Sequence, residues 1–268
     1  MEFLSNQFYR FLYRHWPLRK GRTRIMKLAW RKIRGITICD DDLGNRFMVD
    51  LSSFIDCHLF LNGSFEKEDV LLVRKLIEKF NCHTFLDIGA NIGVFTIPLS
   101  AHPAIRKVFA FEPDPMNHAQ LMGNVFLNDR HERVKVFNLA LSSEAGEADF
   151  YIARSQKDIN LFKYNRGTSS LVYREEIHGE PIKIQMARLD DLLTFKNEAV
   201  AIKIDVEGHE LGVLGGMEQF LRANQCVLHI EIFPARFEQV NGLLERVGYR
   251  AMKEFHLDGD NFIYGKAE

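Results

Sequence analysis

Along this chain, nearly continuous apolar runs alternate with segments in which apolar residues recur every three or four positions. The runs typical of buried parallel strands lie at 84–88, 107–111, 134–139, 199–204 and 226–233. Helical spacing is found at 67–80, directly after 93, and at 117–128, 211–222 and 237–247. This alternation predicts an α/β fold with a doubly wound, mostly parallel sheet. The last extended segments, 249–255 and 261–265, predict an antiparallel hairpin that completes the sheet.

Two further pairs of extended segments interrupt this repeat. Residues 36–50 place β-branched and apolar residues on both sides of an Asp-Asp-Leu-Gly-Asn turn, which predicts a hairpin acting as a lid or a sheet edge. Residues 148–153 and 182–189 predict two strands around a polar loop that contains 167–171. An excursion of this length in a compact fold is typical of a functional lid.

The first 35 residues differ from the rest of the chain in charge. They carry ten Lys and Arg against one Glu, so their net charge is +9 and that of the remainder is -10. Leu4, Phe8, Phe11, Leu12 and Trp16 lie at helical spacing and predict one apolar face, and residues 25–33 repeat the pattern. A basic amphipathic helix is typical of peripheral contact with an anionic membrane surface. The alternative that stays open is a helical pair packed on the rest of the chain or on a partner.

We therefore divide the chain into a basic amphipathic arm (1–35), an N-terminal hairpin with a helix (36–80) and a main α/β domain (81–268). The four cysteines are scattered without a C-x-x-C pair, which favours a reducing compartment and argues against a zinc site. No signal-peptide pattern and no apolar stretch long enough to cross a membrane are visible. These features predict a cytoplasmic protein, with the arm at the inner membrane surface as the open variant.

A glycine-bearing turn follows the first strand of the main domain. The residues there are Asp87, Gly89, Ala90, Asn91 and Gly93. The turn resembles the first motif of class I S-adenosylmethionine (SAM) methyltransferases, D-x-G-x-G-x-G, with Asn91 in place of the middle glycine. Asparagine tolerates the left-handed backbone that such a turn requires. A dinucleotide fingerprint is disfavoured because Val94 stands where its third glycine would fall.

The ends of the next strands provide the remaining predicted cofactor contacts. Glu112, followed by Pro113, ends the second strand nineteen residues beyond Gly93, which is the distance at which a carboxylate reaches the ribose of a nucleoside. The end of the third strand, around Ala140, is where an adenine would lie.

Titratable residues cluster after the strand at 199–204. Asp205, Glu207 and His209 follow it directly, and Glu231 ends the next strand. Because ligands of open α/β sheets bind outside the carboxyl ends of the strands, we expect the chemistry here. A capping role for Glu207 or Glu210 in the following helix is the alternative, and Glu231 is either a site residue or half of a structural pair.

Taken together, these residues resemble the FkbM family of SAM-dependent methyltransferases over roughly residues 45–235. The matching segments are Gly63-Ser64-Phe65-Glu66, Phe85 through Gly93, Phe111-Glu112-Pro113, Ser169-Ser170-Leu171, Leu189-Asp190-Asp191-Leu192 and Ile202-Lys203-Ile204-Asp205-Val206-Glu207-Gly208. The resemblance implies a seven-stranded Rossmann-like class I methyltransferase sheet, SAM as cofactor, and O-methylation of sugars, polyketides or other small molecules.

Such an enzyme aligns an acceptor hydroxyl with the methyl group and removes its proton. The candidates for that base are Asp205, Glu207 and His209, with Glu231 as orienter or second base; Asp205 also counts among the cofactor contacts. No ligand spacing requires a metal, and magnesium stays a minority alternative. The expected partners are a glycan or other small-molecule acceptor, with a homodimer left open.

Three other interpretations remain. Parts of the chain are similar to tRNA guanine methyltransferases, but the acidic remainder and the missing Asn/Asp-Pro-Pro-Tyr/Phe pattern make nucleic acid an unfavoured partner. A non-enzymatic, membrane-associated scaffold would bind no SAM. The third keeps the fold with an NAD-like ligand, which Val94 argues against.

Overall fold

The computed structural model describes residues 2–15, 28, 32–153, 165–175, 178–255 and 259–267. Most of the helix expected around 25–33 lies outside these residues. In the part of the chain that is described, no helix has the length and apolar character needed to span a membrane.

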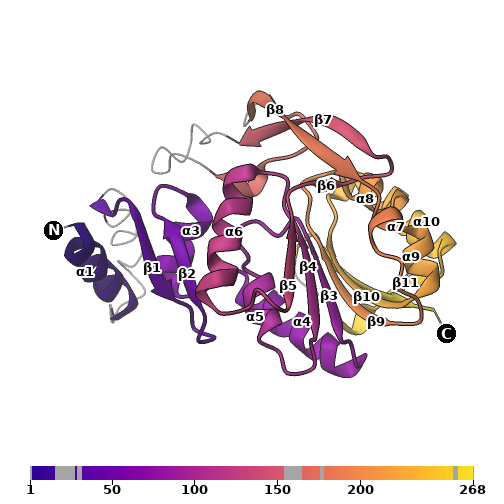
Figure 1. Ribbon diagram of the computed structural model, residues 1–268, viewed down its shortest axis with the longest axis horizontal. Coiled ribbons are helices and arrows are strands. Elements are labelled where there is room, and N and C mark those ends of the chain that lie inside the picture. Colours follow the sequence, from indigo (N-terminus) through magenta and orange to yellow (C-terminus); the bar gives the residue numbers. More distant parts are fainter. Residues whose placement is uncertain are drawn as a thin grey trace.

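A seven-stranded sheet forms the centre of the molecule (Figure 1), in the order β11-β12-β10-β9-β3-β4-β5. Its strands are β3 (Thr84–Ile88), β4 (Lys107–Phe111), β5 (Val134–Phe137), β9 (Ala199–Ile204), β10 (Gln225–Glu231), β11 (Tyr249–Ala251) and β12 (Asn261–Lys266). The strands from β10 to β5 are parallel, and β12 pairs antiparallel with both β10 and β11. The predicted doubly wound fold and its C-terminal antiparallel hairpin are confirmed.

Helices cover both faces of this sheet (Figure 1). One face carries α4 (Lys67–Lys79), α5 (Thr96–Ser100) and α6 (Pro115–Leu127), and the other α7 (Leu189–Leu192), α8 (Glu210–Gly215), α9 (Glu218–Ala223) and α10 (Phe237–Arg246). Each face has its own apolar core. Short 3-10 helices, η2 (Pro234–Arg236) and η3 (Lys253–Phe255), lie in the C-terminal connections.

The single helix predicted over 211–222 is wrong, because the chain breaks it into α8 and α9. The break lies at Gly216, where a Cβ atom would stand 1.9 Å from the carbonyl oxygen of Ser142. This close approach of another loop is a tertiary constraint that helical periodicity does not reveal.

The N-terminal part forms a separate layer beside α6 (Figure 1). It contains α1 (Glu2–His15), the hairpin of β1 (Ile36–Asp40) and β2 (Arg46–Asp50), and α3 (Phe54–Asn62), which the sequence pattern did not predict. The hairpin is confirmed, but it forms a two-stranded sheet of its own and is not an edge of the main sheet. Side chains of α6 and its C-cap residue pair with β2, the strand next to α6: Met48 N donates to Asn124 Oδ1 at 2.7 Å and Arg46 N to Asn128 Oδ1 at 2.9 Å. These bonds hold the layer, and α3 with it, against the main domain.

A third sheet of order β6-β8-β7 lies at the carboxyl end of the central strands. It consists of β6 (Ala140–Leu141), β7 (Gly146–Ala153) and β8 (His178–Ala187), and the loop between β7 and β8 contains the short helix η1 (Arg166–Thr168). Tyr151 and Ser170 form an isolated bridge that ties this loop to β7. The two predicted extra strands are confirmed, and residues 165–171 lie with the ends of β3 and β9 around one cavity.

Candidate active site

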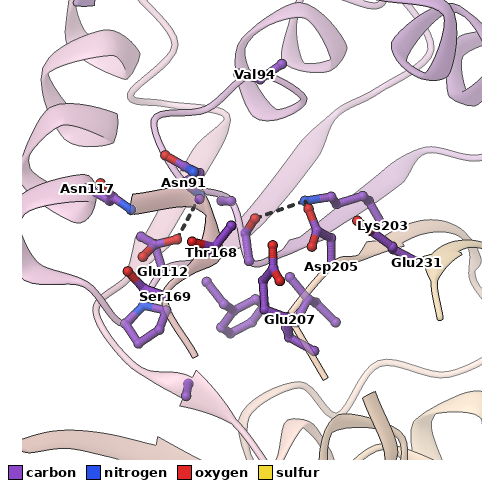
Figure 2. A pocket seen from close by; sticks show the side chains of 18 of the residues that line it. Asn91, Val94, Glu112, Asn117, Thr168, Ser169, Lys203, Asp205, Glu207 and Glu231 are labelled. Atoms are coloured by element: carbon purple, nitrogen blue, oxygen red, sulfur yellow. Dashed lines mark hydrogen bonds and ion pairs between the residues drawn. The ribbon is translucent and has the colours of Figure 1, made fainter. Parts of the chain in front are cut away.

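A cavity of about 280 Å³ opens at the carboxyl ends of the central strands. The turns after β3, β4 and β9 form its floor, the end of β10 one wall, and α3 with the loop at 165–171 its roof. Figure 2 shows Glu112, Asp205, Glu207 and Glu231 gathered around it. The topology thus places the cavity where an open α/β sheet binds its ligand.

The turn after β3 depends on residues that accept a left-handed backbone. Gly89 has φ +80°, and a Cβ atom there would lie 1.9 Å from the carbonyl oxygen of Asp205. Asn91 has φ +51°, and its Oδ1 accepts the N–H of Ile92 at 2.8 Å. Asparagine therefore replaces a glycine here without loss of the turn, as predicted. Gly93 has φ +96° and faces Leu121 and Ile97, away from the cavity wall.

Glu112 is held in place at the tip of β4. Its Oε2 accepts the N–H of Asn91 at 2.8 Å and its Oε1 the N–H of Asp114 at 2.9 Å. Burial, followed by the neighbouring Asp114, raises the pKa of Glu112 to about 8, while the two N–H donors act in the opposite direction. Each oxygen keeps a lone pair for a further donor, so the carboxylate can accept two hydroxyl hydrogens from one ligand.

Asp87 lies behind the turn and not on the cavity wall. It is fully buried, and its Oδ2 accepts the hydroxyl hydrogen of Thr96. Burial raises the pKa of Asp87, and Lys203 opposes this effect most strongly. In this position Asp87 fixes the start of α5 through Thr96, so its effect on a ligand passes through the turn.

Lys203 is a site residue that the sequence interpretation did not select. The residue is 5% exposed, and Nζ donates to the carbonyl oxygen of Gly89 at 3.0 Å and to Asp205 Oδ2 at 3.1 Å. Lys203 thereby joins the β3 turn to the tip of β9, as Figure 2 shows. The available signal was a lysine inside the apolar run 199–204, because a buried charge needs a partner.

Glu207 is tied to the roof. Its backbone is left-handed, with φ +54°. Its Oε2 accepts a hydrogen bond from Arg174 Nη2 at 2.8 Å, and its carbonyl oxygen accepts one from Ser170 Oγ at 2.8 Å. Arg174 also donates to the carbonyl oxygen of Thr168 at 3.2 Å. Burial and Asp205 raise the pKa of Glu207 to about 7, against the opposing effect of Arg174.

His209 lines the cavity and is also engaged. Its Nε2 lies 3.0 Å from the hydroxyl of Ser142, and burial lowers the pKa of its imidazole. Of the two residues considered for helix capping, Glu210 lies in the first turn of α8, and its Oε1 accepts the N–H of Gly208, which precedes the helix, at 2.7 Å.

Two carboxylates face the cavity without a hydrogen bond or salt bridge to any described residue: Glu231 and Glu66. Burial, then Asp205 and Glu207, raise the pKa of Glu231 to about 8. Burial raises the pKa of Glu66 to about 7, with Lys203 acting against it. Glu66 was not selected from the sequence, although it belongs to the Gly63–Glu66 segment that the family resemblance singled out.

The structure brings most of the sequence-predicted residues to this one cavity. Those that line it are Gly89, Ala90, Asn91, Glu112, Pro113, Ala140, Asp205, Glu207, His209 and Glu231. Asp87 and Gly93 stand behind the wall, and their roles as cofactor contacts stay predictions. Within the described ranges, no three His, Cys, Asp or Glu side chains are grouped so that they could hold a metal ion.

Comparisons with known proteins agree with the family resemblance of the sequence motifs. The family model of the methyltransferase FkbM domain matches residues 87–251, more than half of the chain. The methyltransferase sdnD of Sordaria araneosa is 29% identical over 164 residues, which cover 50% of this chain and 60% of that protein. The 31-O-demethyl-FK506 methyltransferase FkbM of Streptomyces tacrolimicus is 29% identical over 193 residues, which cover 63% and 73%.

Among solved structures, TYW2 of M. jannaschii in complex with AdoMet aligns with 14% identity and a TM-score of 0.43. That alignment covers 86% of this chain and 84% of the other. A putative rRNA-methylase from Clostridium thermocellum aligns with 10% identity and a TM-score of 0.46, over 74% and 96% of the two chains.

Proposed function

We propose, from the premise that this chain belongs to the methyltransferase FkbM family, that it transfers the methyl group of SAM to a hydroxyl oxygen of a small acceptor without negative charge. Family membership supports methyl transfer. The name of the Streptomyces relative describes methylation at an oxygen of a small molecule. The acceptor class proposed here is a glycan or a natural product of that kind.

The described residues fit SAM. Glu112 offers the pair of acceptor lone pairs that a ribose needs, on a carboxylate that two backbone N–H groups hold still. Leu139, Ala140 and Phe111 give the adjoining wall the apolar surface suited to an adenine. The carboxylate of Asp205 and the turn at Gly89 would hold the methionine part. When bound, SAM supplies an electrophilic methyl group on a sulfonium.

The geometry favours Glu231 as the base that takes the proton of the acceptor hydroxyl. Asp205 is occupied by Lys203, Glu207 by Arg174, and His209 by Ser142. Glu231 has no such partner in the described structure and faces the cavity. A base with a pKa of about 8 lies close to the operating pH, where general-base catalysis is efficient. This availability of Glu231 is the observation that carries the mechanism.

The charge around the cavity supports an acceptor that is not anionic. Glu66, Glu207 and Glu231 all line it, whereas the described lining residues include one Lys or Arg, Lys203, which already has two bonds to the protein. A phosphate or a nucleic acid backbone would meet unpaired carboxylates there, which costs binding free energy. Phe54, Phe65 and Phe150 add apolar wall for the body of an acceptor.

Incubation with methyl-labelled SAM and fractionated extracts tests the acceptor class, because label in glycan or small-molecule fractions supports it and label in RNA or protein refutes it. Calorimetry with SAM alone separates an enzyme from a scaffold that binds none. Single-turnover methyl transfer then tests the base. We expect Glu231→Gln to lower the rate by about 10²–10⁴-fold with unchanged SAM affinity.

The exposed Glu238→Gln on α10 is the matched control for Glu231→Gln and should keep the wild-type rate. Wild-type activity should rise as the pH rises through about 8, because the base acts in its ionised form, and this limb should vanish in Glu231→Gln. An unchanged rate and pH profile in Glu231→Gln, with a loss in Glu66→Gln, would transfer the role to Glu66.

A further inference from the structure

The inner face of α1 is held on the body by polar contacts. Asn6 is 3% exposed, and its Nδ2 donates to the carbonyl oxygen of Arg34 at 2.9 Å. Arg10 Nη2 donates to the carbonyl oxygen of Asp40 at 2.7 Å, and Arg14 pairs with Asp42. The two arginines of the helix therefore point toward the protein. This arrangement fixes which face of the helix remains outside.

The face that remains outside is aromatic. Phe8 and Phe11, three positions apart, are 59% and 62% exposed. Beside α1, the strand β1 leaves Ile36 71% and Ile38 45% exposed, and a groove between the two elements is lined by Gln7, Arg10 and these isoleucines. We call Phe8, Phe11, Ile36 and Ile38 the arm face. Figure 1 shows α1 and β1 at the end of the molecule remote from the C-terminal helices.

The amino-acid sequence of the N-terminal segment carries the charge that an anionic surface attracts. Residues 1–50 contain eleven Lys and Arg against five Asp and Glu, a net of +6, whereas the rest of the chain has a net of -7. Among the described residues of this end, Lys32, Arg34 and Arg46 are exposed, as are the acids Asp40 and Asp42. The excess of positive charge comes from the six Lys and Arg at positions 19–31, which lie outside the described residues. A second copy of the chain would bring the same positive charge to the face, which disfavours it as the occupant.

From the arm face and its charge, we propose that this end of the protein docks on the anionic surface of a lipid bilayer. The combination of exposed aromatic and aliphatic side chains with surrounding cations is that of an interfacial element, which inserts its apolar side chains at the headgroup boundary and keeps its cations near lipid phosphates. Nucleic acid would use the cations, but it would leave Ile36 and Ile38 in water. The proposal does not depend on the methyltransferase reaction.

Flotation of the full chain with vesicles tests the proposal. We expect co-flotation with vesicles of phosphatidylcholine and phosphatidylglycerol, little with phosphatidylcholine alone, and release by salt. Phe8→Gln with Phe11→Gln should lower the vesicle partition coefficient by about tenfold or more, since two aromatic side chains no longer leave water. Lys32→Glu with Arg46→Glu should weaken flotation on the anionic vesicles.

Tyr173→Gln is the matched control, because Tyr173 is a 54% exposed aromatic residue outside the arm face and its replacement should leave flotation unchanged. Equal thermal unfolding and equal SAM binding in calorimetry show that each variant is folded. Because SAM binding and flotation are measured separately, a loss of flotation is distinguished from a failure of the proposed enzyme function. The proposal is overturned if the wild type does not float or if the phenylalanine variant floats as well as the wild type. If the wild type is retained on RNA but does not bind vesicles, and the phenylalanine variant loses this retention, the occupant of the arm face is nucleic acid and the proposal is likewise overturned.

Discussion

Lys203 offers the sharpest test of how the site is held together, and the substitution to examine is Lys203→Met. Methionine keeps most of the length and apolar contact of the lysine stem but removes the charge that meets Gly89 and Asp205. Burial alone lowers the pKa of Lys203, but the carboxylates of Asp205, Asp87 and Glu66 outweigh this effect and raise it. The ammonium is thus the charge around which these acids are arranged.

The size of the effect follows from the burial of the pair. Removing one partner of a buried ion pair costs about 3–5 kcal/mol, because the other charge stays in the protein unpaired. The side chain of Asp205 keeps 25% exposure against 6% for Lys203, so water screens part of the remaining charge. We therefore expect the lower end, a loss of about 3 kcal/mol in the free energy of unfolding.

Urea denaturation of the unliganded chain measures this loss. The double variant Lys203→Met with Asp205→Asn should lose about 1–2 kcal/mol less free energy of unfolding than the sum of the two single variants, because it leaves no unpaired charge in the site. Lys183→Met is the matched control: Lys183 pairs with Asp149 at 2.9 Å, but the two side chains are 61% and 45% exposed, and unfolding should hardly change. A loss below about 1 kcal/mol for Lys203→Met, or the absence of coupling to Asp205, would refute the reasoning.

The pH dependence of Lys203→Met provides an independent check. Lys203 lowers the pKa values of Glu66 and Glu231, which still lie above their unfolded values at about 7 and about 8. Removing the lysine raises both further, so the folded variant binds more protons than the unfolded chain across this range. Stability then falls as pH rises. Relative to wild type, the variant should lose more stability as the pH rises above about 7, because wild-type Glu66 and Glu231 release their protons at about 7 and about 8 and the variant releases them at higher pH.

Two further substitutions test the cofactor wall and the roof. Glu112→Gln should weaken SAM binding about 10–100-fold in calorimetry. The amide nitrogen of glutamine cannot accept a hydrogen bond, so it would place a donor against the N–H of Asn91 or of Asp114. Equal affinity would refute the ribose role. Arg174→Met should increase hydrogen exchange at 165–171 and raise the Michaelis constant for the acceptor more than it lowers kcat, since it frees Thr168 and Glu207; unchanged exchange would refute the role of this ion pair.

The fold was predictable where burial alone determines the pattern. Strands β3 and β9 are buried on both faces, so they show as continuous apolar runs. Helix α3 was not predicted because Phe54–Asn62 is apolar on nearly all sides, and periodicity cannot distinguish such a segment from a strand. The break between α8 and α9 was not predicted for another reason. A side chain at Gly216 would collide with the carbonyl oxygen of Ser142, a residue remote in sequence.

The candidate site shows a similar division between residue types and their pairings. Spacing predicted that Glu112 would stand beside the β3 turn, because in a parallel sheet consecutive strands end at the same edge. It also selected Asp205, Glu207 and His209 as candidate bases, with Glu231 as orienter or second base, and residue types alone could not decide among them. What separates them is occupancy: Glu207 meets Arg174 from 33 positions away, and His209 meets Ser142 from 67 positions away. Such partners are set by the path of the roof and of the loop after β6. Among these four residues the described structure leaves Glu231 without a side-chain partner, and this pairing, which residue types do not reveal, is what selects Glu231.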